Sequence, residues 1–156
     1  MNDILKKTLT LSDAIKISKP LKYNLMIKTV GSMCNLNCDY CYYLDKSALY
    51  HDVSIMSLDL LEKIIRNYIE TNAAEELVFN WHGGEPLLAG LGYYKEIIKL
   101  QNKYCGNKKI YNTLQTNAVL VNEEYASFFR DNNFLIGVSI DGPQDIHDRY
   151  RKDKLG

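Results

Sequence analysis

The stretch YNLMIKTVGSMCNLNCDYC, residues 23–41, joins an apolar run to a loop that holds three cysteines. Residues 23–30 are apolar and rich in side chains that favour strands, so they predict a β-strand. Three further short apolar runs, residues 77–81, 110–115 and 134–140, predict three more strands. The cysteine loop therefore directly follows the first of four expected strands.

Amphipathic helical patterns separate the expected strands. In each pattern the apolar side chains recur at helical spacing and form one stripe. Ser57 and Asn122, the latter followed by two acidic residues, are the expected N-caps of the first and third helices. The apolar positions are Leu61, Ile64, Ile65 and Tyr68 in the first helix, Tyr94, Ile97 and Ile98 in the second, and Tyr125, Phe128 and Phe129 in the third.

Alternating strands and helices predict the α/β class, with parallel strands joined by helical crossovers. In this class the chemistry lies in the loops after the carboxyl ends of the strands. The distinctive loops of this sequence, residues 31–41, 82–86, 116–117 and 141–143, occupy those positions.

The predicted domain organisation is an N-terminal extension, residues 1–20, followed by one core domain, residues 21–156. Four parallel strands leave the last strand as an apolar edge, and the sequence stops before a helix could follow that strand. We therefore expect an incomplete core domain, the front part of a longer, truncated enzyme.

Composition limits the partners and the location of the protein. Nineteen basic residues balance nineteen acidic ones, so the charge gives no reason to expect binding to nucleic acid or to a membrane surface. The first ten residues lack the apolar core of a signal peptide, and no membrane span is present. A cytoplasmic protein is the expectation.

Three of the four cysteines, Cys34, Cys38 and Cys41, are separated by three and two residues. This spacing is awkward for disulfides and suits a metal centre in a reducing compartment. Iron–sulfur clusters are held by such thiolates, usually four for a 4Fe–4S cluster, so three ligands leave one iron open for a reaction. The alternative is a structural zinc site with a fourth ligand from Cys105, His51 or His82, although structural zinc normally has two paired ligand clusters.

Three later loops carry polar or glycine-rich motifs. In Trp81-His82-Gly83-Gly84-Glu85-Pro86 two glycines let the backbone approach a ligand, and Glu85 can accept from an ammonium group; a plain turn would also explain the glycines. Asn117 ends the third strand, Ser139 can bond a ribose hydroxyl, and Arg151 offers a fork for a carboxylate. The first two could instead cap turns, and Arg151 could belong to a solvated basic surface.

The cysteine spacing, with an aromatic residue before the third cysteine, resembles the cluster motif of the radical S-adenosylmethionine superfamily. From about residue 21 to 154 the sequence is similar to the anaerobic sulfatase-maturating enzymes within it. The strings that carry this resemblance are Ile27-Lys28-Thr29-Val30, Cys41-Tyr42-Tyr43-Leu44, the six residues from Trp81 to Pro86, Leu114-Gln115-Thr116-Asn117, and Val138-Ser139-Ile140-Asp141-Gly142-Pro143 with His147, Asp148 and Arg151 behind.

The resemblance implies the N-terminal portion of a partial (β/α) TIM-like barrel, the radical S-adenosylmethionine core. It implies a 4Fe–4S cluster on Cys34, Cys38 and Cys41, with Tyr40 near the adenine and the Gly-Gly-Glu motif at the methionine amino group. The cofactor-binding candidates are Tyr40, Gly83, Gly84, Glu85, Asn117, Ser139 and Arg151. The family's catalytic base is expected beyond Gly156, and Cys105 is expected to be structural or incidental.

The implied reaction is reductive cleavage of S-adenosylmethionine to a 5′-deoxyadenosyl radical that oxidises a sulfatase cysteine or serine to formylglycine. The implied partners are a sulfatase polypeptide or another peptide, and an electron donor such as flavodoxin or ferredoxin. The alternatives are another radical peptide maturase with the same motifs, and an inactive truncated chain that binds a cluster without turnover.

Overall fold

The computed structural model describes residues 21–43 and 54–154. Four strands form one sheet in the order β1-β2-β3-β4, and each neighbouring pair is parallel. The α/β class with a parallel sheet is therefore confirmed. The strands are β1 (Leu25–Lys28), β2 (Glu76–His82), β3 (Lys109–Thr116) and β4 (Phe134–Val138).

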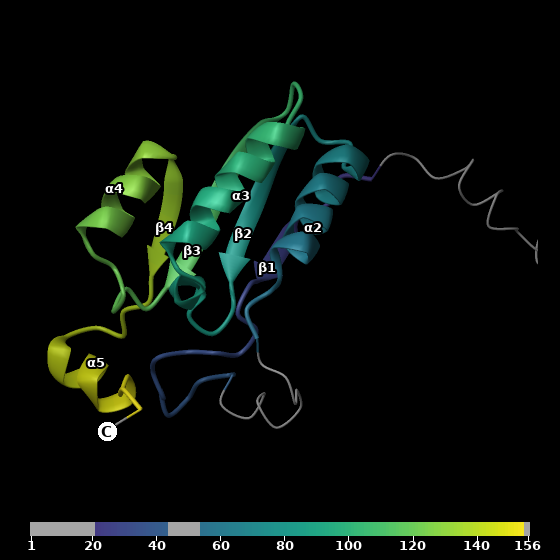
Figure 1. Ribbon diagram of the computed structural model, residues 1–156. Coiled ribbons are helices and arrows are strands. Elements are labelled where there is room, and N and C mark those ends of the chain that lie inside the picture. The colour runs from purple at the N-terminus through teal and green to yellow at the C-terminus, as the bar shows by residue number, and fades with distance from the viewer. Residues whose placement is uncertain (1–20, 44–53, 155–156) are drawn as a thin grey trace, which may run out of the picture.

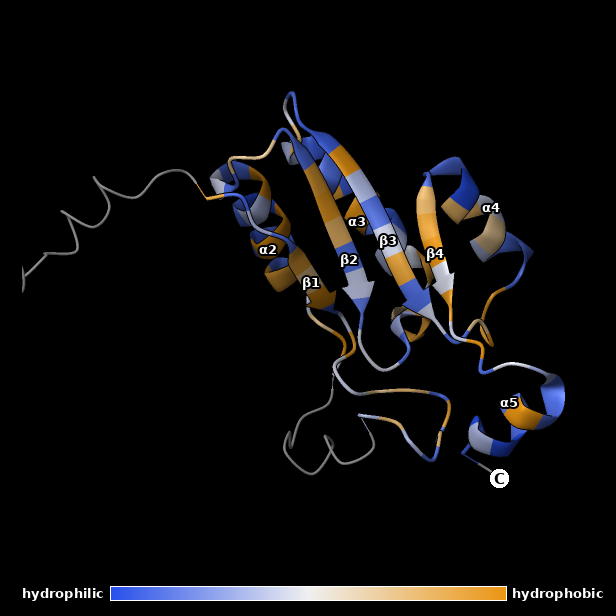
Figure 2. Ribbon diagram, turned by 180° about the vertical axis from the view of Figure 1, so that it is seen from behind, coloured by the Kyte–Doolittle hydropathy of each residue, from blue (hydrophilic) through white to orange (hydrophobic). Residues whose placement is uncertain are grey.

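Helices connect the strands, as a parallel sheet requires. Figures 1 and 2, seen from opposite sides, show α2, α3 and α4 over one face of the sheet, whereas no described helix covers the other face. A 3₁₀ turn, η2 (Pro86–Ala89), follows β2, and α5 lies beyond the carboxyl ends of the strands. The helices are α2 (Leu58–Thr71), α3 (Leu91–Tyr104), α4 (Glu123–Asp131) and α5 (Gln144–Tyr150).

The core lies between the sheet and these three helices. Phe79 and Trp81 of β2 are buried, and Tyr68 of α2 packs edge-on against Phe79. Both predicted N-caps are confirmed: Ser57 Oγ accepts from the Leu60 amide, and Asn122 Oδ1 accepts from the Tyr125 amide. The predicted apolar positions of α2 and α4 lie in or against the core, whereas in α3 the predicted position Ile98 does not, and Tyr93 and Leu100 are buried there instead.

Two strands are shorter than predicted, and one helix was not predicted. β1 ends at Lys28 because the Gly31 amide donates to the Lys28 carbonyl, in a turn where Gly31 has φ +58°. β4 ends at Val138 rather than at residue 140. The expectation that no helix could follow the fourth strand is wrong. Helix α5 begins after Pro143, whose carbonyl accepts from the backbone amides of Ile146 and His147.

Some expectations fall outside the described residues. These are the N-terminal extension, residues 1–20, and the possible zinc ligand His51. Over the part of the chain that the structure describes, every helix is too short or too polar to cross a membrane.

Candidate functional site

A cavity of about 300 Å³ lies at the carboxyl edge of the sheet. It is bounded by loops that follow all four strands, although these loops are far apart in the sequence. All of the predicted site residues except Glu85 line it. Its lining includes Cys34, Cys38, Tyr40, Cys41, Gly83, Gly84, Asn117, Ser139 and Arg151.

The two glycines after β2 let this loop touch the backbone of the cysteine loop. The Gly84 amide donates to the Gly31 carbonyl over 2.9 Å, and the Glu85 amide donates to the Met33 carbonyl over 2.7 Å. A Cβ on Gly84 would lie 2.0 Å from the Met33 oxygen, and Gly83 has φ +133°. The glycine pair is therefore required by the contact between two loops, in addition to any contact with a ligand.

Glu85 is fully buried beneath the cavity. One carboxylate oxygen accepts from the Leu87 amide and from the Thr116 hydroxyl, over 3.0 and 2.8 Å, and the other accepts from the Asn117 amide over 2.8 Å. The carboxylate thus ties the loop after β2 to the loop after β3. This arrangement gives Glu85 a positioning role, whereas the sequence suggested an acceptor for an ammonium group.

The end of β3 is joined to the loop after β4 by hydrogen bonds between residues that line the cavity. Gln115 Nε2 donates to Ser139 Oγ over 2.9 Å, and the Ser139 amide donates to the Thr116 carbonyl. A Cβ on Gly137 would lie 2.3 Å from Gln115 Oε1, so the glycine lets the Gln115 side chain cross the strand. Gln115 thereby orients the hydroxyl that was predicted to bond a ribose.

Residues 150–153 close the cavity against the cysteine loop. The Asn37 amide donates to the Lys152 carbonyl, and the Asp39 amide donates to the Tyr150 carbonyl. Leu36 and Asp153 form an isolated antiparallel bridge. The cysteine loop is therefore held by β1, which precedes it, and by residues 150–153, which bond to its middle.

A three-residue cluster stabilises that closure. Arg151 forms a bidentate pair with Asp141, with Nε–Oδ2 and Nη2–Oδ1 distances of 2.8 and 3.1 Å. The Tyr40 hydroxyl donates to the same carboxylate, and the guanidinium carbon lies 5.6 Å from the centre of the Tyr40 ring. The structure thus holds Arg151 with an acid that sequence reasoning had not singled out, although the Asp-Gly-Pro motif after the fourth strand was a signal.

Burial and charge set the protonation of these groups. Hydrogen bonds from Arg151 and Tyr40 lower the pKa of Asp141, and desolvation together with the bond to Asp141 raises the pKa of Tyr40 to about 12. Burial raises the pKa of Cys34 and of Cys38, and the charge of Arg151 opposes the shift at Cys38. Because metals bind thiolates, loading the site would release protons.

The three cysteines of the first loop lie at one end of the sheet. In residues 21–43 and 54–154, no three His, Cys, Asp or Glu side chains lie close enough to share one metal ion. Cys34, Cys38 and Cys41 nevertheless line the same cavity. The structure therefore brings the three thiols to one site, where they could hold a metal centre.

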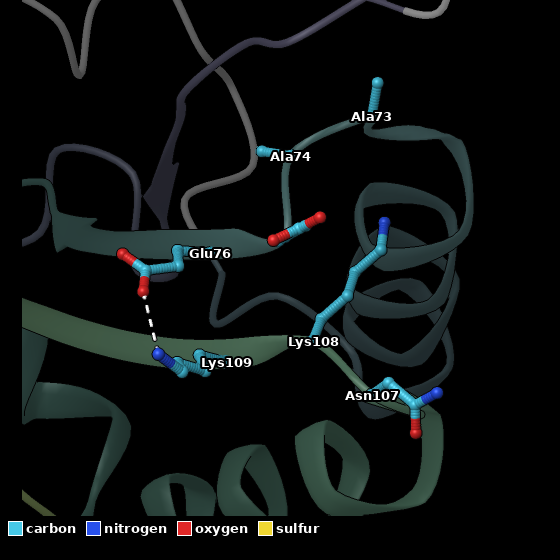
Figure 3. A pocket seen from close by; sticks show the side chains of 7 residues that line it. Ala73, Ala74, Glu76, Asn107, Lys108 and Lys109 are labelled. Carbon is cyan, nitrogen blue, oxygen red and sulfur yellow. Dashed lines mark hydrogen bonds and ion pairs between the residues drawn. The ribbon is translucent and has the colours of Figure 1, made fainter.

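A second cavity, of about 290 Å³, lies at the amino edge of the sheet (Figure 3). Its two lysines already have partners within the protein. Glu76 and Lys109 form an exposed ion pair, and the ammonium of Lys108 donates to the Ile69 and Asn72 carbonyls at the end of α2. None of the predicted site residues lines this cavity, which leaves the carboxyl edge as the candidate site.

Comparisons with known proteins agree with the geometry of that site. The family model described as the radical SAM superfamily matches residues 29–155. A serine-type anaerobic sulfatase-maturating enzyme of Bacteroides thetaiotaomicron is 50% identical over 141 residues, which cover 89% of this chain and 34% of that protein. A cysteine-type enzyme of Clostridium perfringens is 41% identical, with 85% of this chain and 36% of that protein covered.

Solved structures share the fold. A structure described as native anSMEcpe with bound AdoMet and Cp18Cys peptide has a TM-score of 0.77 and 40% identity, covering 88% of this chain and 36% of that chain. The same protein with bound AdoMet alone gives a TM-score of 0.79 at 41% identity, over 85% of this chain and 36% of that chain. This chain spans about a third of the length of the relatives that it matches.

Proposed function

Because this chain belongs to the radical S-adenosylmethionine superfamily, we propose that it binds a 4Fe–4S cluster and S-adenosylmethionine in the carboxyl-edge cavity. One observation carries the proposal: three thiols, a glycine loop and several polar side chains from four separate loops line the same cavity. Cys34, Cys38 and Cys41 would each hold one iron. The fourth iron would remain for the amino and carboxylate groups of the methionine moiety.

When bound, such a cluster supplies the electron that breaks the sulfur–C5′ bond of S-adenosylmethionine and releases methionine and a 5′-deoxyadenosyl radical. The residues of this chain bind and orient the reactants. Ser139, held by Gln115, offers its hydroxyl to the ribose, and Tyr40 offers its ring to the adenine. Arg151, held in place by Asp141, lies at the side of the cavity where its guanidinium could pair with the carboxylate of the cofactor.

The sulfatase-maturating relatives suggest the substrate. We propose that the radical removes a hydrogen atom from Cβ of a cysteine or serine in a sulfatase, and that the resulting radical loses one electron to a redox-protein acceptor and one proton. Serine then gives formylglycine directly, whereas cysteine gives a thioaldehyde that water hydrolyses to formylglycine with release of sulfide. A cavity of about 370 Å³ on the uncovered face of the sheet shares His82 and Gln115 with the cofactor cavity. A peptide on this face would lie next to the cofactor, and a flavodoxin or ferredoxin in the cytoplasm would supply the electron.

The test measures iron, cofactor cleavage and product separately. The chain is loaded with iron and sulfide without oxygen and reduced with dithionite. It is then given S-adenosylmethionine and sulfatase peptides that carry cysteine, serine or alanine at the target position. We expect about four irons per chain, 5′-deoxyadenosine, and formylglycine in the cysteine or serine peptide only, detected by mass spectrometry.

Different failures contradict different parts of the proposal. A chain that binds stoichiometric zinc and no iron contradicts the cluster. Formation of 5′-deoxyadenosine with a crosslink or thioether in place of formylglycine contradicts the sulfatase assignment and indicates another peptide-modifying radical enzyme. An iron-loaded chain that leaves S-adenosylmethionine intact contradicts the radical chemistry.

A further inference from the structure

The Asn117 side chain reaches from the end of β3 to the first cysteine of the cluster motif. Its amide nitrogen lies 3.7 Å from Cys34 Sγ and 2.9 Å from Asn35 Oδ1. Its amide oxygen accepts from the Val119 backbone amide over 3.0 Å. Because that oxygen is occupied by a donor, the amide is oriented with its two N–H groups toward Cys34 and Asn35.

Glu85 fixes the backbone of Asn117. Its fully buried carboxylate accepts from the backbone N–H of Asn117 over 2.8 Å and from the Thr116 hydroxyl over 2.8 Å. A buried carboxylate that satisfies three donors is costly to displace, because each donor left without a partner loses a hydrogen bond in a low dielectric. Asn117 is therefore held in one position relative to Cys34.

The contact from Asn117 differs in origin from the other hydrogen bonds to the cysteine sulfurs. The Leu36 amide donates to Cys34 Sγ and the Tyr43 amide donates to Cys41 Sγ, each over 3.4 Å. In both cases the donor lies two residues after the cysteine, so the cysteine loop provides it by its own geometry. Asn117 lies 83 residues from Cys34, so only the packing of β3 against the cysteine loop provides its contact.

We propose that Asn117 is a positioning residue that raises the reduction potential of the cluster through an N–H···S hydrogen bond to Cys34, with Glu85 holding it in place. This inference rests on the proposed cluster. Reduction adds one electron and increases the negative charge on the thiolate sulfurs, so a hydrogen-bond donor stabilises the reduced state more than the oxidised state. Hydrogen bonds to the sulfurs are one of the features that set the potentials of such clusters.

The test compares reduction potentials of the iron-loaded chain. In Asn117→Ala the donor is lost, and we expect roughly a tenfold fall in the equilibrium constant for one-electron reduction, a shift of about 59 mV to more negative potential. The measurement is a dithionite titration followed by electron paramagnetic resonance of the reduced cluster. Asn107→Ala, an exposed asparagine before β3 at the opposite edge of the sheet, is the matched control and should leave the potential unchanged.

A second variant covers a failure of Asn117→Ala to load iron. Asn117→Asp keeps the oxygen that accepts from Val119 but replaces the donor with an acceptor, so we expect a larger negative shift. An unchanged or higher potential in a variant with normal iron content would overturn the inference. A wild-type chain that takes up no iron would overturn the proposed cluster as well, which separates the two failures.

Discussion

The carboxyl and amino edges of the sheet each border a cavity of about 300 Å³, but the polar groups at the two edges have different roles. At the amino edge, Lys108 and Lys109 are paired with carbonyls of α2 and with Glu76. At the carboxyl edge the thiols of the cysteine loop line the cavity. Glu85 accepts from the Asn117 backbone N–H beneath the cavity, and Asp141 pairs with Arg151 at its side. Polar lining alone therefore does not identify a site, because the lysines of the amino edge are paired within the protein whereas the thiols of the carboxyl edge face its cavity.

The largest difference between the two edges is expected when one thiol is removed from each. Cys38→Ala should abolish iron uptake, because a three-ligand site that loses one ligand cannot hold the cluster. Cys105→Ala, at the C-terminus of α3 on the amino side, should bind iron as the wild type does. Iron and sulfide analysis after anaerobic loading checks both, and loss of iron in both variants would show that the ligand set is wrong.

Glycines at the two edges offer the next largest contrast. Gly84→Ala should lower the free energy of unfolding by about 3 kcal/mol, since its Cβ would lie 2.0 Å from the Met33 oxygen. Gly106→Ala meets no atom within 4 Å and should cost about 1 kcal/mol, because only its φ of +54° opposes a side chain. Denaturant unfolding measures both; equal losses would contradict the loop contact.

A buried and an exposed glutamate at the two edges are expected to differ in their contribution to stability. Glu85→Gln should cost about 2 kcal/mol of stability, because an amide cannot accept from all three donors that the buried carboxylate satisfies. Glu76→Gln loses an exposed pair with Lys109 and should change stability by less than about 0.5 kcal/mol. Urea titrations at neutral pH compare the two, and a neutral Glu85→Gln would show that the carboxylate does not hold the loops together.

The smallest effect is expected at the amino edge itself. Lys108→Met should cost about 1 kcal/mol, since its ammonium satisfies carbonyls at the end of α2, while iron uptake should remain unchanged. Lys109→Met, which loses an exposed ion pair, is the control for removing a charge there. Thermal unfolding and iron analysis together check the prediction. A loss of iron in Lys108→Met would mean that the two edges are coupled.

Local patterns in the sequence predicted most of the fold. Apolar runs and helical spacing indicated the four strands and three of the helices, and Ser57 and Asn122 were recognised as N-caps from residue type and position. The unpredicted helix α5 is only seven residues long, with no buried residue, so it has no apolar stripe to reveal it. Strand ends were misjudged because turns such as the one at Gly31 depend on backbone contacts rather than on hydropathy.

The sequence predicted most of the residues that line the cavity, but it did not predict the contacts between the loops that carry them. The cysteine spacing and the Gly-Gly-Glu motif are short patterns with a direct chemical reading, so the sequence alone indicated the thiols and the loops around them. The sequence did not indicate that Gly84 approaches the Met33 carbonyl or that Arg151 is held by Asp141. These contacts join loops after different strands.

The order of strands and helices along the chain, the loops that carry chemistry and the three thiols could be predicted from the sequence alone, because each depends on residues close together in the chain. The folded structure was needed to show which groups face the cavity and which already have hydrogen-bond partners beneath it. Asn117 reaches Cys34 across 83 residues, and Tyr40 reaches Asp141 across 101. Such contacts arise because parallel strands bring their carboxyl ends to one edge, and pairing there depends on register and packing rather than on any local pattern.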